Sequence, residues 1–579
     1  MAKNSPNKNQ KQRQATARLV LMAAILLCVN ILASYFHTGL DLTQEKRFTL
    51  SSSTKKLLHN MQETAVVEVY MKGKFPAELQ RLQEAVRERL MSFKDIAGNN
   101  IVFKFVNPFE DKTIDEQKII AHTMSEKGMP VLYRQPQNDE EEENSNPYFF
   151  PYALVQYNGK EVPVMLLEDP PGKSAAEKIS YAEALLEYKF ASAINRLSQR
   201  DHIRIGYITG NGEDLGINSY DMLSTLPRFY DLDTINLSRI AQISLAYNAI
   251  IISQPTIPFT GSYKLKIDQY VMHGGHVLWA LNMLNASLDT LRKENSPMMM
   301  AMELGLNLDD ILYKYGVRVN NDLVEDMQCM QLPRIQDGGG AEMRDWIYFP
   351  KLNPTSDNPI VRNMDFIQGG FTNSIDTIRN GIKKTVLLAS SKYSRTATAP
   401  VRVSLSAMNY PQEAAMFNKP YRPVAVLLEG KFNSVYQGRL TPEYLYLLDS
   451  LNQTYIPKCP NDNKMIITSI GDIFHNDYST KDGILSLGYY KYTGEYFANK
   501  YFLLNCLEYL TDSTGILESR SKIVKARLLD TGRAKDEKTM WQVVNVCIPI
   551  GLVFIFASIY FFVRKRKYET RPTESVPAK

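Results

Sequence analysis

The sequence predicts an α/β protein, and three observations support that prediction. Short apolar strands alternate with amphipathic helices along most of the 579 residues, which is the pattern of sheets covered by helices. Several strands in the second half of the chain are apolar on both faces, as in a buried parallel sheet. Apolar residues make up 44% of the chain, enough to give each of several domains of about 100–200 residues its own core.

One uncharged apolar segment lies near each end of the chain, at residues 19–36 and 541–563. Each segment is long enough to cross the hydrocarbon core of a bilayer as a helix, which takes about 18 residues. We therefore predict two transmembrane helices that hold the protein to membrane lipid. A cleaved signal peptide is the alternative for the first segment, and a buried core helix is the alternative for the second.

Basic residues flank both apolar segments on the side of the chain ends. The arm of residues 1–18 carries five lysines and arginines and no acid, and residues 564–567 read Arg-Lys-Arg-Lys. Because positive charge stays on the cytoplasmic side, both termini are predicted to be cytoplasmic and the residues between the segments to lie outside the cytoplasm. The net charge of +5 is small for this length and does not indicate a nucleic-acid partner.

The residues after the first segment predict a smaller α/β unit. A short helix is expected after Ser51 or Ser52, which are good N-caps, and a hairpin is expected around Asn158-Gly159. Strands are predicted at residues 65–71, 101–106 and 130–134, and helices at 76–97, 114–127 and 174–197. This order of elements is typical of a thioredoxin-like layout. The chain has no Cys-x-x-Cys, so we expect no redox chemistry.

From residue 202 onward the pattern indicates a doubly wound α/β sheet. Buried strands are predicted at residues 203–209, 248–255, 276–282 and 464–472, with a shorter one near 234, and helices at 220–229, 261–275, 441–451 and 499–511. The predicted organisation is a basic cytoplasmic arm, a transmembrane helix, the thioredoxin-like domain, the doubly wound domain with a large insertion, a charged helical linker, a second transmembrane helix and a basic cytoplasmic tail. The corresponding residues are 1–18, 19–36, 37–200, 201–512 with the insertion at 283–400, 513–540, 541–563 and 564–579.

The segment IRIGYITGNGEDLG, residues 203–216, has the strand and glycine turn of a nucleotide-binding loop. A dinucleotide fold needs Gly-x-Gly-x-x-Gly so that backbone N–H groups meet the pyrophosphate. Here the third glycine, Gly216, comes one residue late, and Glu213 and Asp214 would repel a phosphate. No Lys-Ser/Thr pair follows, so the segment is not a P-loop, and we expect no nucleotide cofactor.

The polar residues that follow each predicted strand form a second hypothesis. In an open α/β sheet, ligands bind at the carboxyl ends of the strands. The candidates for such a ligand crevice are Gly210, Asn211, Gly212, Glu213, Gln254, Asn282 and Asp472. They suit a small polar ligand, a peptide end or a sugar. The alternative is that they only cap helices and satisfy loop backbone.

Catalytic and metal-binding patterns are absent from the sequence. It has no Gly-x-Ser-x-Gly elbow and no cysteine at a strand–helix turn. His273 and His276 begin a strand rather than follow one, on the edge opposite the crevice, so we predict no metal site. Three of the five cysteines lie between the apolar segments, and at most one disulfide bridge can join them.

A resemblance to a known family rests on an ordered set of segments. RFTLSSSTKKLL follows the first apolar segment, and YITGNGE, AIIISQP, DQYVMHGGHVLWALN, LNLDDILYKYGVRVNNDLV and SIGDIFHND come after it in that order. Together they resemble the GldG type, an extracytoplasmic auxiliary component of an ABC transporter linked to gliding motility in Bacteroidetes. The doubly wound domain also resembles glutamine-amidotransferase-like folds, as in related domains of intraflagellar transport proteins.

The resemblance implies an anchored accessory protein of the bacterial inner membrane, with the bulk of its chain in the periplasm. Its expected partners are an ABC permease and a cytoplasmic ATPase, because the chain itself has no Walker-type loop. It would bind a substrate, an envelope component or a partner protein without catalysis. Two alternatives stay open, namely a membrane-tethered envelope hydrolase or amidotransferase working at Glu213 and Asp472, and a structural scaffold with an empty crevice.

Overall fold

The computed structural model describes most of the chain outside its termini. The described residues are 16–28, 49–133 apart from 74, 111, 127–128 and 130–131, 148–198 apart from 168–173, 203–521 apart from 294–297, 336–339, 363, 443–444, 447, 449–453, 482 and 513, and 537–568. The chain divides into two compact units, residues 1–524 and 525–579, and each is described by itself. Within the first unit we call residues 49–198 the N-terminal region and residues 203–521 the central region.

The N-terminal region is built on a four-stranded sheet in the order β2-β1-β5-β6. The strands are β1 (Ala65–Val69), β2 (Ile101–Phe105), β5 (Tyr152–Tyr157) and β6 (Lys160–Met165). β1 is parallel to β2 and antiparallel to β5, and β5 pairs with β6. The predicted hairpin is present, because Asn158 and Gly159 both have positive φ, 53° and 71°, as a two-residue type I′ turn requires.

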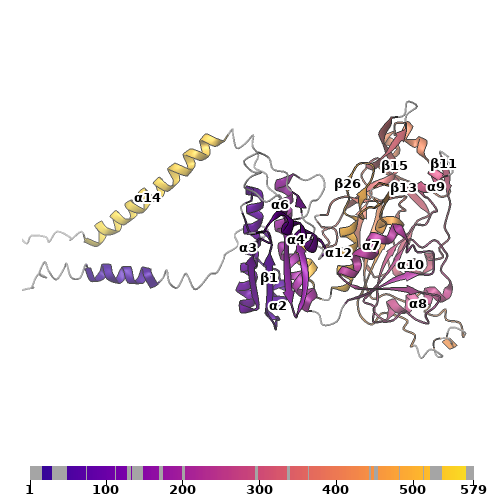
Figure 1. Cartoon of the computed structure of the whole chain (residues 1–579), viewed down its shortest axis with the longest axis horizontal. Coiled ribbons are helices and arrows are strands. Elements are labelled where there is room, and N and C mark those ends of the chain that lie inside the picture. Colours follow the sequence, from indigo (N-terminus) through magenta and orange to yellow (C-terminus); the bar gives the residue numbers. More distant parts are fainter. Residues whose placement is uncertain are drawn as a thin grey trace, which may run out of the picture. The chain divides into compact units, whose positions relative to one another are not determined.

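Helices cover both faces of this sheet (Figure 1). The helices α2 (Ser52–His59), α3 (Ala77–Ala97) and α6 (Ala175–Ser198) share one core with β1 and β5. The helix α4 (Ile114–Glu126) packs on the other face. Ser51 is the N-cap of α2, and its hydroxyl accepts a hydrogen bond from the Thr54 N–H at 3.2 Å, as its residue type predicts.

The strand predicted at residues 130–134 does not belong to the main sheet. Its described part, β3 (Leu132–Tyr133), pairs instead with β4 (Tyr148–Phe149) in a separate two-stranded sheet. In the main sheet, both edges of β1 are occupied, one by β2 and the other by β5. The third strand along that sheet is therefore the first strand of the hairpin.

The central region contains a large mixed sheet. Its parallel part has the order β8-β7-β9-β10-β22. These strands are β7 (Arg204–Thr209), β8 (Asp231–Asn236), β9 (Ala249–Ser253), β10 (His276–Ala280) and β22 (Asn463–Thr468). In chain order this arrangement is 2-1-3-4-5, so the strand order reverses between β7 and β9. That switch point is where open α/β sheets bind their ligands.

The predicted doubly wound parallel sheet accounts for only one half of the observed sheet. Antiparallel strands continue it beyond β22 in the order β21-β18-β15-β14. They are β14 (Cys329–Ile335), β15 (Ala341–Pro354), β18 (Lys383–Ala389) and β21 (Pro423–Gly430), and β16 (Ile367–Gln368) pairs beside β15. Three of these four strands come from the segment predicted as an insertion, because β21 pairs with the open edge of β22, and β18, β15 and β14 are then added one after another.

The remainder of that segment forms smaller sheets beside the large one. The pairs are β11 (Met298–Ala301) with β20 (Val401–Ser404), β12 (Val317–Val319) with β17 (Ile375–Thr377), and β13 (Asp322–Asp326) with β19 (Ser394–Thr398). The expected helix followed by a strand is also present, as α10 (Asp309–Tyr315) and β12. The helix ends at Gly316, whose φ of 116° lies in the left-handed region that favours glycine.

Alternation along the central strands divides the core into two layers. On β9, Ala249 and Ile251 belong to one buried cluster, while Ile250 and Ile252 belong to the other. The first layer lies under α7 (Tyr220–Thr225) and α12 (Asn499–Thr511), and the second lies under α8 (Gly261–Met272) and α10. Strands apolar on both faces are therefore buried on both faces, as a helix-covered parallel sheet requires.

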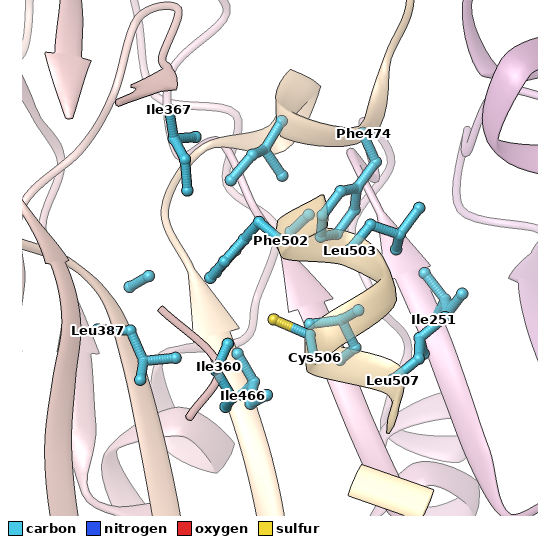
Figure 2. Close-up of a cluster of buried hydrophobic side chains, with 14 of the residues drawn as sticks. Ile251, Ile360, Ile367, Leu387, Ile466, Phe474, Phe502, Leu503, Cys506 and Leu507 are labelled. Atoms are coloured by element: carbon cyan, nitrogen blue, oxygen red, sulfur yellow. The ribbon is translucent and has the colours of Figure 1, made fainter. Parts of the chain in front are cut away.

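The first layer is built around α12. Figure 2 shows Phe502, Leu503, Cys506 and Leu507 projecting from α12 into a cluster that includes the sheet residues Ile251 and Ile466. Their spacing of three and four residues places them on one face of the helix. Burial raises the pKa of the Cys506 thiol well above its ordinary value, so this cysteine is unreactive packing. All five cysteines are free thiols.

The second unit contains α14 (Lys538–Tyr568). Residues 538–566 of it form, within the described ranges, the one helix that is long and apolar enough to cross a membrane. Near the N-terminus, residues 16–28 form a shorter apolar helix, and the rest of the predicted first span, residues 29–36, lies outside the described residues. Of the predicted helical linker at 513–540, residues 516–521 form a short 3₁₀ helix, η7 (Ile516–Ser521), and residues 522–536 lie outside the described ranges, as do the arm at 1–15 and the tail at 569–579.

Candidate functional site

The glycine turn after β7 packs against its own chain. Gly210 and Gly212 have φ of 118° and 85°, and a Cβ on Gly212 would lie 2.0 Å from Thr256 Oγ1. The Asn211 carbonyl accepts hydrogen bonds from the N–H groups of Thr256 and Ile257 at 2.8 and 2.9 Å. Glycine is therefore required at 212 by the close approach of the segment that follows β9, which explains the motif without a phosphate.

Glu213 turns back onto the same loop. Its Oε2 accepts a hydrogen bond from the Asn211 N–H at 2.7 Å, and its side chain is buried. Burial raises the pKa of Glu213 above its ordinary value, and backbone hydrogen bonds from residues 210, 211 and 213 oppose that rise. One carboxylate oxygen thus stabilises the turn, while the other, Oε1, has no partner among the described residues.

Gln254, Asn282 and Gly471 meet where three neighbouring strands end. The Gly471 N–H donates to Asn282 Oδ1 at 2.7 Å, and a Cβ on Gly471 would lie 2.9 Å from Asn282 Cγ and 3.0 Å from Gln254 Cγ. Gln254 has a φ of 46°, in the left-handed region that a non-glycine residue rarely occupies. Such strain is kept at functional sites when the surrounding structure holds it in place.

Asp472 lies against a loop that the sequence did not associate with it. A Cβ on Gly370 would lie 2.6 Å from Asp472 Oδ2, so only glycine fits there without moving the carboxylate. Asn373 holds this loop to the strand ends, because its Oδ1 accepts from the Met283 N–H at 2.8 Å and its N–H donates to the Ser469 carbonyl at 3.1 Å. Burial raises the pKa of Asp472 to about 7.

Buried polar atoms without a protein partner gather at this edge of the sheet. Within the described part of the chain they are Asn211 Oδ1, Glu213 Oε1, Asp214 Oδ2, Thr372 Oγ1, Thr468 Oγ1 and His475 Nε2. We call these six residues, together with Ser219, Ser253, Gln254, Asn282 and Asp472, the carboxyl-edge cluster. An unmet buried polar group costs about 1–3 kcal/mol, so such a concentration is typical of a site whose partners are water or a ligand.

Contacts between separate loops join the cluster into one site. The Tyr207 hydroxyl donates to the Asp214 carbonyl at 2.8 Å, and the hydroxyls of Ser219 and Ser253 lie beside it. The Asn476 side chain donates to the Ile217 carbonyl at 2.9 Å, which fixes the loop after β22 against the loop after β7. Burial lowers the pKa of the nearby His475 to about 4, so its imidazole is neutral at physiological pH.

The structure also keeps some predicted residues apart. No hydrogen bond joins Glu213 to Asp472 among the described residues, since Glu213 bonds to its own loop and Asp472 lies against Gly370. At the opposite edge, His276 Nδ1 lies 2.5 Å from Asn463 Oδ1, which is a structural contact. No group of three or more histidine, cysteine or acidic side chains with metal-binding geometry occurs in the described ranges.

Sequence reasoning missed Asp214, His475 and the loop that carries Gly370 and Thr372. Gly370 and Thr372 lie in the segment that was predicted as an insertion, so no strand end led to them. The available signal was the run Gly-Gly-Phe-Thr-Asn-Ser at residues 369–374, in which paired glycines precede three hydrogen-bonding side chains. His475 lies three residues beyond Asp472 in a segment already singled out, SIGDIFHND, and no rule of spacing selected it.

Comparisons with known proteins match both regions of the chain. A family model described as ABC-type uncharacterized transport system matches residues 203–506, and a model of a domain of unknown function (DUF7088) matches residues 44–156. An uncharacterized protein of Borreliella burgdorferi is 21% identical over 580 residues, covering 97% of this chain and 99% of that protein. Among solved structures, the mmIFT52 N-terminal domain matches at 12% identity with a TM-score of 0.30, covering 54% of this chain and 98% of that one.

Proposed function

Because the chain belongs to the family of the ABC-type uncharacterized transport system, we propose that it is a membrane-anchored accessory subunit of an ABC transporter that recognises a small polar ligand. The family match carries this proposal. The matched residues, 203–506, include every candidate at the strand ends, from Gly210 to Asp472. The ligand site of the proposal is the carboxyl-edge cluster, where unpartnered buried atoms lie at the switch point of the sheet.

In the proposed topology, two spans hold both termini in the cytoplasm and leave the two regions in the periplasm of a bacterial inner membrane. The apolar helix α14 and the basic residues outside both apolar segments support it. The spans would dock against a permease subunit, and a separate cytoplasmic ATPase would supply the energy, since the sequence has no Walker-type loop. Residues 37–200 and 201–512 are the proposed domains.

The N-terminal region is proposed to be thioredoxin-like. The strand order β2-β1-β5-β6, with one parallel pair followed by an antiparallel hairpin, supports that layout. So do the helices α3 and α6 on one face and α4 on the other. The resemblance to the GldG type extends the proposal to transport in gliding motility or at the cell envelope, and it rests on the ordered sequence segments alone.

The chemistry of the carboxyl-edge cluster favours an uncharged or cationic ligand. Three carboxyl side chains line it, Glu213, Asp214 and Asp472, and they would repel a phosphate or a carboxylate. Hydroxyl and amide groups from four strand ends supply both donors and acceptors. A sugar or the amino end of a peptide has the matching hydrogen-bonding groups.

Affinity purification of the full chain from native membranes tests the partner claim. We expect an ATPase subunit and a multi-span permease to purify with it, and their abundance to fall when residues 541–563 are replaced by an unrelated apolar span. A preparation from intact membranes that contains neither subunit would reject the accessory role.

The ligand claim has its own test. Native mass spectrometry of the full chain in lipid nanodiscs should detect a small polar molecule that Gly370→Val removes, because the added side chain displaces the Asp472 carboxylate. Gly340→Val is the matched control, since a Cβ at Gly340 meets no atom within 4 Å. Equal occupancy in both variants would place the ligand elsewhere.

A hydrolase or amidotransferase is the second candidate, and one observation favours it. A carboxyl group with a pKa of about 7 is suited to proton transfer at neutral pH, and burial gives Asp472 such a pKa. A catalytic pair of Asp472 and Glu213 is not supported. Glu213 accepts a hydrogen bond from its own loop, whereas Asp472 lies against the loop that carries Gly370. Turnover of peptidoglycan fragments or amides that Asp472→Asn abolishes would establish the enzyme and displace the binding function.

A further inference from the structure

A separate cavity of about 620 Å³ lies between the N-terminal and central regions, away from the carboxyl-edge cluster. Its walls come from β6 and α6 on one side, and from α12 and η7 together with residues 225–230 on the other. Both regions belong to one compact unit of the chain. The volume is that of a small-molecule site, which typically occupies about 300–1,000 Å³.

Apolar and aromatic side chains form most of the cavity wall. Val164 and Leu185 line it from the N-terminal region, and Phe229, Tyr230 and Leu504 line it from the central region. Such a surface holds the apolar body of a ligand by removing it from water.

Cations outnumber acids around the cavity. The cations are Lys189, Arg196, Arg228, Lys500 and Arg520, and the acids are Glu161 and Glu508. Glu508 already accepts hydrogen bonds from the hydroxyls of Tyr188 and Ser192, the second at 2.8 Å. Lys500 is paired with Asp221 at 3.0 Å.

Two of these cations have no acidic partner among the residues that the structure describes. Arg196 lies over the Phe229 ring, with its guanidinium carbon 4.7 Å from the ring centre, and forms no ion pair with any described residue. Arg228 also forms no ion pair with any described residue, and it is exposed at the cavity rim. A guanidinium presents a planar set of donors that matches a carboxylate or a phosphate.

We propose that this cavity binds an organic anion with an apolar body. Arg196 and Arg228 hold the carboxylate or phosphate head, and the hydrocarbon or aromatic part packs against Phe229 and Leu504. Because the walls come from both regions, the bound anion also stabilises their contact. Its head group has the opposite charge preference from the carboxyl-edge cluster, so the protein carries two sites for two classes of ligand.

Binding of 1-naphthyl phosphate to the full chain, in nanodiscs of neutral phosphatidylcholine, tests the proposal. We expect saturable binding and a higher melting temperature, with no saturable binding of uncharged 1-naphthol and weaker binding of inorganic phosphate. Arg196→Gln and Arg228→Gln should each weaken binding about tenfold, the loss of one charge-assisted hydrogen bond. Arg239→Gln is the control, because Arg239 is an exposed arginine outside the cavity.

A second variant keeps the test independent of charge. Leu504→Trp fills the cavity from a half-buried position on α12 and should abolish binding while the unfolding transition stays cooperative. Competition by phosphatidic acid placed in the nanodisc identifies a lipid as the source of the anion, and absence of competition identifies a soluble one. Binding of 1-naphthol as tight as that of the phosphate, or affinities unchanged in both arginine variants, would overturn the proposal.

Discussion

Two groups of buried acids in the central region differ in how completely their oxygens are hydrogen-bonded. Asp268 on α8 is fully buried, and it accepts from the hydroxyls of Tyr315 and Ser434 at 3.0 and 2.6 Å and from the Val435 N–H at 3.1 Å. In the carboxyl-edge cluster, Glu213 and Asp214 each keep a buried oxygen without a partner among the described residues. Burial alone therefore does not distinguish the two groups of acids, whereas the number of partnered oxygens does.

Two acids in the smaller sheets follow the pattern of Asp268. Asp322 accepts from the Ser374 N–H and hydroxyl at 2.8 and 2.6 Å, and Asp326 accepts from the Ser391 N–H at 2.6 Å. Burial raises the pKa of both carboxyl groups, and these hydrogen bonds oppose the rise. They hold loops to strands and need nothing from outside the chain.

The largest expected effect on stability comes from removing Asp268, the buried acid whose carboxylate accepts several hydrogen bonds. Asp268→Ala leaves the Tyr315 hydroxyl, the Ser434 hydroxyl and the Val435 N–H buried without an acceptor, so we expect a loss of about 3–5 kcal/mol in unfolding free energy. Chemical denaturation of the full chain measures it. Asp289→Ala, at an exposed position on α9 (Leu288–Lys293), should change stability by less than about 0.5 kcal/mol. Similar losses in the two variants would refute the structural role of Asp268.

Removing one hydroxyl from each group of residues gives a finer comparison between the hydrogen-bonded acids and the carboxyl-edge cluster. Ser434 and Thr468 are both fully buried, but the Ser434 hydroxyl donates to Asp268 while Thr468 Oγ1 has no partner among the described residues. Ser434→Ala should therefore cost about 1.5–3 kcal/mol, the value of a hydrogen bond to a charged group. Thr468→Val, which keeps the side-chain shape, should be neutral or stabilising in denaturation and should weaken ligand binding. A cost for Thr468→Val equal to that of Ser434→Ala would remove Thr468 from the proposed site.

Much of the fold could be predicted because it depends on local pattern. The hairpin at Asn158-Gly159, the helices α3 and α6 and the buried strands β7, β9 and β10 each have their signal within a few adjacent residues. The antiparallel half of the sheet has no such local signal. For example, β15 pairs with β18, and the paired residues lie about 35 positions apart in the sequence. Strand pairing over that distance depends on the packing of the whole sheet, so it cannot be predicted from a short stretch of sequence.

The candidate site shows the same division. The rule that ligands bind at strand ends led to Gln254, Asn282 and Asp472, and the first two meet at Gly471. It could not lead to Gly370, because the loop that carries it reaches Asp472 only through the antiparallel half of the sheet. The rule also could not tell which buried oxygens have a hydrogen-bond partner. That depends on how the loops pack in the folded protein and not on the residue type.

Asp472 should make the stability of the protein depend on pH up to the neutral range. Burial raises its folded pKa from 3.8 to about 7, so the folded chain binds more protons than the unfolded chain within that window. Stability therefore falls as pH rises from about 4 to 7. Asp472→Asn should remove that slope and stabilise the protein at pH 8 by on the order of 1–2 kcal/mol, well below the full value of a three-unit shift because the side chain is partly exposed. Melting temperatures between pH 4 and 8 measure it, and an unchanged slope in the variant would count against a raised pKa at Asp472.

Substitutions of Glu213 should have the smallest effect on unfolding free energy. They should also distinguish most clearly between a structural role and a role in ligand binding. Glu213→Gln keeps an oxygen to accept the Asn211 N–H and removes a charge that burial disfavours, so unfolding free energy should change by less than about 1 kcal/mol. Glu213→Ala leaves that N–H unmet and should cost about 1–2 kcal/mol. If the turn is only structural, the Gln variant behaves as wild type in every assay. If Oε1 faces a ligand, the Gln variant keeps its stability and loses affinity, because an amide replaces the carboxylate beside the ligand.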